Sequence, residues 1–313
     1  MKNAMMLYGV TLGKRYSKRQ KAWFFSHIGK AYPALGFPLT LDESKSRAFG
    51  VSNAVAGDWE KAGVIFAASY DTPTRSFLPN LCYYPFHTEK NIAEERKDLA
   101  LQAVLTLMLA AVAYFSARLF LSGQGVEKIL FLLLAMGVAL CTIYFATPRA
   151  NRFNFNRNSA SLAVMEKIAE NCKGNPNVAF AFLDKNVNSF EGLKEFQNSR
   201  ALGEKHVVLL DCLSYGPTLL LAHRAGENAQ AEKLIELAKN AGVQVTDRVY
   251  SDQAAEQNVL SFAKHMLVLV SGTVKGKEFV VEHTKSPQDI QVDTERLSGI
   301  AQTLAAYAGP AAE

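Results

Sequence analysis

Cysteine is scarce in this chain, and several common site motifs are absent from it. The 313 residues include four cysteines, none of which stands in a Cys-x-x-Cys spacing. Neither a disulfide framework nor a zinc ribbon is therefore expected, and free thiols suit a reducing compartment. The sequence has no Walker pattern, no Gly-x-Gly-x-x-Gly and no Gly-x-Ser-x-Gly. These absences argue against the phosphate loops and the serine hydrolase elbow that such motifs build.

A large excess of one charge is also missing. The formal net charge is +5 at neutral pH, which is too small to indicate a nucleic-acid partner. The basic residues cluster near the amino terminus and around the apolar segment described next, and this distribution fits contact with an anionic lipid surface. Residues 1–13 lack the pattern of a cleaved secretion signal.

Charge is almost absent from two long runs in the middle of the chain. Between residues 99 and 121 the only formal charge is Arg118, and residues 129–146 carry none. A bilayer core takes roughly 20 apolar residues per helical span. We therefore expect two transmembrane helices, at about 99–121 and 127–147, joined by a polar loop over residues 122–128.

A pair of buried core helices in a soluble α/β protein is the alternative reading of these runs. Core helices usually carry one apolar stripe, whereas the segment Leu130–Met136 is apolar on every face. A helix that is apolar on every face favours insertion into a membrane. The lipid bilayer is therefore the first expected binding partner of the protein.

Basic residues flank the outer ends of the expected hairpin more densely than its turn. The outer flanks hold Lys90, Arg96 and Lys97 on one side and Arg149, Arg152 and Arg157 on the other, and the turn side holds Arg118 and Lys128. By the positive-inside rule, both outer ends lie in the cytoplasm. We expect a two-span protein, as in a bacterial-type inner membrane, with cytoplasmic amino and carboxyl termini.

Outside the hairpin, short apolar runs alternate with amphipathic ones. Strands are expected at 37–41, 48–51, 63–68, 178–183, 206–211 and 266–271, and helices at 14–31, 159–172, 192–198, 229–241 and 293–308. This alternation predicts an α/β three-layer sandwich around a mixed, largely parallel sheet. Residues 1–98 have too few elements to bury a core alone, so we expect 1–98 and 148–313 to form one α/β domain interrupted by the hairpin at 99–147.

Five segments follow expected strands or open expected helices in a recognisable order. They are Ser69-Tyr70-Asp71, Arg157-Asn158-Ser159-Ala160-Ser161, Asp184-Lys185-Asn186-Val187, Asp211-Cys212 and Glu282-His283-Thr284. In order and context they resemble the motifs of zinc-dependent aminopeptidases of peptidase family M twenty-eight. The resemblance covers most of residues 32–308 apart from the hairpin. It implies an aminopeptidase-like fold with two co-catalytic zinc ions at the sheet edge.

Several positions depart from the pattern that this resemblance implies. Ser69 stands where the family has a zinc-binding histidine, although the following orienting aspartate is kept as Asp71. Arg157 replaces the aspartate that bridges the two metals, and Asn186 and Val187 replace the glutamates that act as base and ligand. A guanidinium is permanently positive, and neither an amide nor an alkyl side chain accepts a proton from a metal-bound water at neutral pH.

Two family ligand positions are retained, as Asp211 and His283, and Asp184 also keeps its family identity. A catalytic zinc needs at least three protein ligands, so we expect no cofactor and no catalytic residue. Asp211 could form a hydrogen bond with His283 or pair with Arg157. We favour the Arg157 pair, because the guanidinium would supply the positive charge that the metals provide in the family.

Three functions remain open from the sequence. The first is a membrane-anchored, non-catalytic aminopeptidase-like module that binds or scaffolds a peptide at the cytoplasmic face. The second is an active membrane-bound zinc peptidase with a non-standard metal site that recruits Asp71, Asp184, Glu191, Asp211 and His283. The third is an adaptor whose hairpin pairs with other membrane proteins through small residues such as Ala110 and Gly137.

The other histidines show no ligand-like spacing. We expect a structural or surface role for each of them: His27, His87, His206, His223 and His265.

Overall fold

A single mixed sheet runs through the computed structural model, which describes residues 1–43, 50–78, 80–187 and 189–309. The strands are β1 (Leu39–Glu43), β2 (Ser52–Ala56), β3 (Val64–Ser69), β4 (Cys82–Tyr83), β5 (Val178–Leu183), β6 (His206–Asp211), β7 (Thr218–Arg224), β8 (Thr246–Tyr250), β9 (His265–Lys275) and β10 (Glu278–Glu282). Their order is β1-β2-β5-β3-β6-β9-β10-β4, and β7 joins β9 to β8.

The centre of the sheet is parallel and its margins are largely antiparallel. Strand β3 pairs in parallel with β5 on one side and with β6 on the other, so that Phe66 lies beside Phe180 and Val208. Strand β6 then pairs in parallel with β9. Parallel strands are buried on both faces, which explains why the central strands read as unbroken apolar runs.

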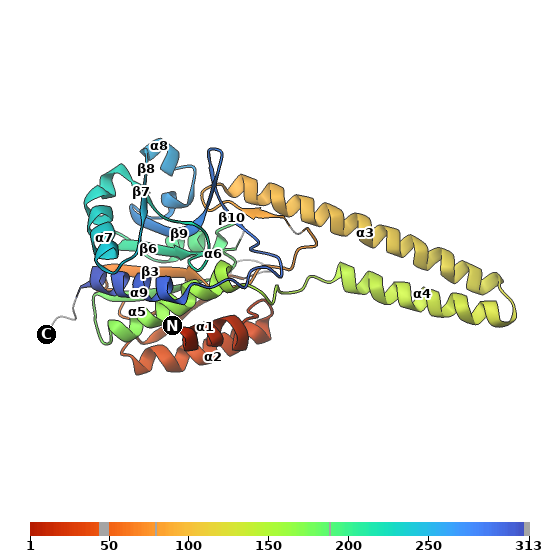
Figure 1. Ribbon diagram of the computed structural model, residues 1–313. Helices are drawn as coiled ribbons and strands as arrows, with labels where there is room; N and C mark the ends of the chain where they lie inside the picture. Colours follow the sequence, from red (N-terminus) through yellow and green to blue (C-terminus); the bar gives the residue numbers. More distant parts are fainter. Residues whose placement is uncertain (44–49, 79, 188, 310–313) are drawn as a thin grey trace.

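Helices cover both faces of the sheet (Figure 1). The helices outside the hairpin are α1 (Lys2–Met6), the π-helix η1 (Leu7–Thr11), α2 (Lys18–Ala34), the π-helix η2 (Phe155–Ser159), α5 (Ala160–Asn171), α6 (Glu191–Ser199), η3 (Ala225–Glu227), α7 (Asn228–Asn240), α8 (Asp252–Ala255), η4 (Val259–Phe262) and α9 (Thr294–Ala308). Helices α1, α2, α5, α7 and α9 form one apolar core with the sheet, and α6, α8 and η4 form the second. This arrangement confirms the predicted three-layer α/β sandwich.

Helices α3 (Thr88–Ser122) and α4 (Gly125–Ala146) extend away from the sandwich as an antiparallel pair (Figure 1). Only the first turns of α3 rest on the domain, where the Asp98 carboxylate accepts hydrogen bonds from the Ser76 hydroxyl at 2.6 Å and the Phe77 N–H at 3.1 Å. From Leu99 onward α3 is about 36 Å long. Both helices are long and apolar enough to cross a membrane, and almost none of their apolar windows is buried.

The boundaries of this hairpin differ from those expected. Helix α3 begins at Thr88 and not at Leu99, because the polar residues before Leu99 continue the same helix across the surface of the domain. The connection is only Gly123 and Gln124, since Glu127 and Lys128 already belong to α4. Both residues are good helix formers, so the polar loop expected over residues 122–128 is wrong in length.

The remaining differences between the expected and the observed strands arise from the pairing of strands in the sheet, which local sequence pattern does not determine. The strand expected at 48–51 is wrong: β2 begins at Ser52, where it finds partners in both β1 and β5, and residues 48 and 49 lie outside the described ranges. Four strands are missing from the expected set. Strands β4, β8 and β10 are short and gain their hydrogen bonds only from neighbours brought by the fold, and β7 is an apolar run that local pattern does not distinguish from a buried helix.

Candidate functional site

The candidate site lies at the carboxyl ends of the central parallel strands. Ser69 ends β3, Asp184 follows β5 directly, and Asp211 ends β6. Ligands of open α/β sheets bind at this edge. Arg157 reaches the same edge from the π-helix η2, which opens α5.

Arg157 and Asp211 form a buried ion pair, as the sequence analysis expected. The second guanidinium nitrogen, Nη2, donates to the Val187 carbonyl at 2.6 Å. The guanidinium also lies over the ring of Tyr83 at 3.8 Å from its centroid, and the Tyr83 hydroxyl donates to Asp211 at 2.7 Å. Both side chains of the pair are less than a tenth exposed. Burial is the largest single influence on the pKa of Arg157 and lowers it, but Asp211 and the other acidic groups around the guanidinium together raise the pKa overall.

Asp289 fixes the backbone segment that positions the Arg157 side chain. Its two carboxylate oxygens accept the N–H groups of Asn156 at 2.7 Å and Arg157 at 3.2 Å. Burial raises the pKa of Asp289 to about 7, although these two hydrogen bonds oppose the shift. The side-chain oxygen of Asn156 in turn accepts the Ser214 N–H at 2.8 Å. Arg157 is therefore fixed by the fold and does not lie at a membrane surface, so it should not be counted among the flanking charges that set orientation.

Two of the positions that depart from the family pattern bind each other. The amide of Asn186 donates to the Ser69 hydroxyl at 3.0 Å and accepts the Leu193 N–H at 3.2 Å. The backbone N–H of Asn186 donates to Asp71 at 3.3 Å. Burial, followed by the negative charge of Asp184, raises the pKa of Asp71 to about 7. Asn186 therefore links the ends of β3 and β5 through Ser69 and Asp71.

A cavity of about 520 Å³ opens beside these carboxylates. Asp71 and Asp184 line it, and Lys18 and Lys21 lie on its wall from the start of α2. The Lys21 ammonium pairs with Asp184, which also accepts the Ser52 N–H at 3.1 Å. The cavity therefore offers two carboxyl groups, one of which already binds an ammonium from this chain.

His283 and Glu191 are not part of the Arg157–Asp211 contacts. The Asp211 oxygens bind Arg157, Tyr83 and the thiol of Cys212. The imidazole Nδ1 of His283 is buried and has no hydrogen-bond partner among the described residues. Glu191 is exposed at the start of α6.

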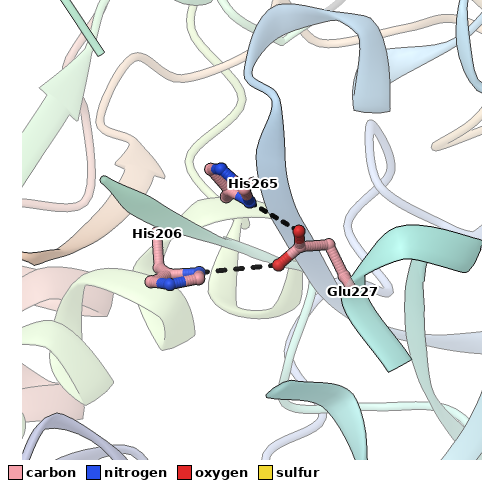
Figure 2. A group of neighbouring side chains, drawn as sticks. All are labelled: His206, Glu227 and His265. Atoms are coloured by element: carbon pink, nitrogen blue, oxygen red, sulfur yellow. Dashed lines mark hydrogen bonds and ion pairs between the residues drawn. The ribbon is translucent and has the colours of Figure 1, made fainter. Parts of the chain in front are cut away.

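Sequence patterns gave no sign of two features that the fold creates, the place of Tyr83 beside Arg157 and a cluster of two histidines with a glutamate. Tyr83 lies in a two-residue strand with no pattern of its own, so nothing in the sequence marks it. His206 and His265 lie beside Glu227 at the opposite edge of the sheet (Figure 2). Their separation in sequence hides this cluster, and only the pairing of β6 with β9 reveals it.

Comparisons with known proteins place this fold. No protein-family model matches the chain. No curated protein matches it in sequence. Among solved structures, glutaminyl cyclase from Porphyromonas gingivalis aligns with a TM-score of 0.59 at 11% identity, over 98% of this chain and 96% of that one.

Two further structures align similarly. Glutaminyl cyclase from Fimbriiglobus ruber gives a TM-score of 0.56 at 14% identity, over 97% of this chain and 93% of that one. A Zn-dependent exopeptidase from Parabacteroides distasonis gives a TM-score of 0.56 at 11% identity, over 98% of this chain and 97% of that one. At these identities the likeness concerns the fold alone, so the chain has the aminopeptidase-like fold shared by glutaminyl cyclases and zinc-dependent exopeptidases.

Proposed function

We propose that this protein is a membrane-anchored, non-catalytic binding module with an aminopeptidase-like fold. The observation that carries the proposal is the buried Arg157–Asp211 pair, with Tyr83 against both partners. A permanent cation at the place that the family resemblance gives to a bridging carboxylate repels a divalent ion instead of binding it.

The donor groups around the pair also do not fit a catalytic zinc centre. Such a centre uses three protein ligands from histidine, carboxylate or thiolate. Here Ser69 offers a neutral hydroxyl that Asn186 already occupies, and Val187 offers only its carbonyl, which Arg157 occupies. No step of peptide hydrolysis or cyclisation can therefore be assigned to these residues.

The cavity beside Asp71 supports a binding role. The Lys21–Asp184 contact shows that an ammonium is accepted at its wall. Asp71 lines the same cavity, where its carboxyl group accepts the Asn186 N–H and makes no hydrogen bond to an ammonium within the described residues. We infer that the cavity holds an amine-bearing ligand, such as the amino terminus of a peptide, next to Asp71.

The hairpin supports anchoring of this cavity near a membrane. The chain that follows the hairpin is joined to the segment that follows β3: the Arg75 N–H donates to the Arg149 carbonyl at 2.8 Å, and the Asn151 N–H donates to the Pro73 carbonyl at 2.8 Å. Pro73 and Thr74 also line the cavity. With both hairpin ends cytoplasmic, as the flanking charges predict, the cavity would face the inner leaflet.

Zinc loading and activity test the loss of the metal site. Detergent-purified protein is loaded with zinc, desalted, and assayed for metal and for turnover of aminoacyl anilides and glutaminyl peptides. We expect no turnover, and we expect His283→Ala to leave any bound zinc unchanged. Turnover together with zinc that is lost in His283→Ala would overturn the proposal in favour of an active peptidase or cyclase.

A further inference from the structure

Two histidines and a glutamate meet at the edge of the sheet opposite to the candidate site (Figure 2). His206 and His265 are the first residues of β6 and β9, whereas Asp211 ends β6. The two groups are therefore separated by the full length of a central strand. This cluster does not depend on the proposed function.

The topology of the sheet builds the cluster. Strands β6 and β9 are parallel neighbours in a register that pairs His206 directly with His265. Strand β7 runs antiparallel to β9, so it ends at the edge where β9 begins. The short helix η3 follows β7 and delivers Glu227 between the two imidazoles.

The three side chains point at one another in a ligand-like way. One oxygen of Glu227 lies 2.6 Å from Nδ1 of His265, and the other lies 3.5 Å from Nδ1 of His206. The Glu227 side chain is only 7% exposed. Within the described residues, its second oxygen and Nδ1 of His206 are buried and lack a hydrogen-bond partner. A buried carboxylate oxygen and a buried imidazole nitrogen that lack hydrogen-bond partners lower the stability of the fold. The two atoms lie 3.5 Å apart, so one ligand could satisfy both.

We propose that His206, Glu227 and His265 bind one divalent transition-metal ion of the zinc class. Imidazole nitrogens and a carboxylate are favoured ligands of such ions. With metal–ligand distances of about 2.0–2.1 Å in a tetrahedron, neighbouring ligand atoms lie about 3.3 Å apart. The His206–Glu227 distance of 3.5 Å is close to this value, and Nδ1 of His265, at 2.6 Å from Glu227, needs to withdraw by less than about 1 Å.

The surroundings of His265 fit this assignment. Its other ring nitrogen, Nε2, lies 2.7 Å from one carboxylate oxygen of Glu204, and Lys264 binds the other oxygen of Glu204 at 2.8 Å. A carboxylate on the outer nitrogen fixes the tautomer and directs the lone pair of Nδ1 toward the metal. Water would complete the tetrahedron, and the ion would tie the starts of β6 and β9 to the connection between β7 and α7.

An ion pair between a protonated His265 and Glu227 is the competing explanation, and metal affinity separates the two. Chelator-stripped full-length protein in detergent is titrated with zinc against a chromophoric competitor, and cobalt is used as a spectroscopic probe. We expect one site per chain. His206→Ala and Glu227→Gln should each weaken zinc binding by more than 100-fold, and Glu204→Gln by 10–100-fold.

His87→Ala is the matched control, because it removes an imidazole that pairs with a carboxylate elsewhere on the surface. It should leave zinc affinity and the tetrahedral cobalt spectrum unchanged. Absence of a zinc site in the wild type, or equal affinity in His206→Ala and the wild type, would overturn the proposal. Zinc that is lost in His283→Ala but kept in His206→Ala would instead place the metal at the family site and would refute both proposals.

Discussion

At the scale of single residues, Arg157 lies at the centre of the buried contacts of the candidate site. It contacts Asp211, Val187 and Tyr83, and all of these contacts are buried. Removing one partner of a buried ion pair leaves the other charge without compensation, which typically costs about 3–5 kcal/mol. We expect Arg157→Ala to lower the free energy of unfolding by that amount, measured by thermal and denaturant unfolding in detergent.

Arg152→Ala is the control for this change, since Arg152 is exposed in the same segment. It should alter stability by less than about 0.5 kcal/mol. If Arg157→Ala and Arg152→Ala unfold at the same temperature, the pair contributes nothing to stability and the role given to Arg157 is wrong.

Asp71 gives the molecule a specific pH dependence. Its pKa is raised to about 7 by burial and then by Asp184, against about 3.9 in an unfolded chain. Between these values the folded state binds more protons than the unfolded state, so stability falls as pH rises from about 4 to 7. The loss amounts to at most about 4 kcal/mol.

Asp71→Asn tests this dependence, because the amide keeps an oxygen to accept the Asn186 N–H. We expect the variant to be more stable than the wild type at pH 8 and to lose that advantage at pH 4.5, by chemical denaturation at both values. An advantage that is equal at the two pH values would show that Asp71 does not titrate in this range.

At the scale of elements, the hairpin helices expose their apolar side chains, whereas the domain helices bury them. Helix α4 has no buried residue, and its own apolar side chains project outward on all sides. The domain helices α5 and α9 instead bury most of their apolar residues inside the sandwich. The exposed apolar surfaces of both helices and their two-residue turn are what a membrane-spanning hairpin would have.

Cysteine labelling tests the orientation of this pair. Gln124 lies in the turn and Lys173 lies on the surface of the domain, and both are exposed. We expect Gln124→Cys to react with a membrane-impermeant maleimide in intact cells, and Lys173→Cys to react only after permeabilisation, with the wild type as baseline. The reverse pattern would mean that the termini lie outside, against the positive-inside prediction.

At the scale of the whole molecule, the sheet is assembled from both sides of the hairpin. Strand β3 precedes α3, yet it lies between β5 and β6, which both follow α4. The two apolar cores contain no residue of α3 or α4. The domain should therefore fold without the hairpin but not without either flanking half.

Replacement of the hairpin tests this independence. The helices meet near the domain, where the Gln102 amide donates to the Phe145 carbonyl at 2.6 Å. We expect that a short glycine-serine turn in place of residues 103–144 moves the protein from the membrane fraction to the soluble fraction. Its unfolding temperature should stay within a few degrees of that of the full chain. A soluble protein with lost cooperativity would show that the hairpin stabilises the domain directly.

Local pattern predicted much of this molecule. The strands at 178–183 and 206–211 match β5 and β6, because a buried parallel strand is an apolar run whose ends are set by polar residues. The ion pair of Arg157 with Asp211 also followed from sequence, once an arginine was recognised where the family resemblance implies a carboxylate. Local pattern could not predict the role of Tyr83, because its two-residue strand is too short to show the alternation of apolar and polar residues that marks a strand.

The sequence by itself determined the class of the fold and the presence of a long apolar hairpin, because periodicity and hydropathy are local properties. The tertiary structure alone decided which side chains meet. It placed Tyr83 on Arg157, paired Asn186 with Ser69, and brought His206 and His265 to Glu227. Such contacts depend on strand order and register, which bring residues far apart in the chain within a few ångströms and leave no trace in local spacing.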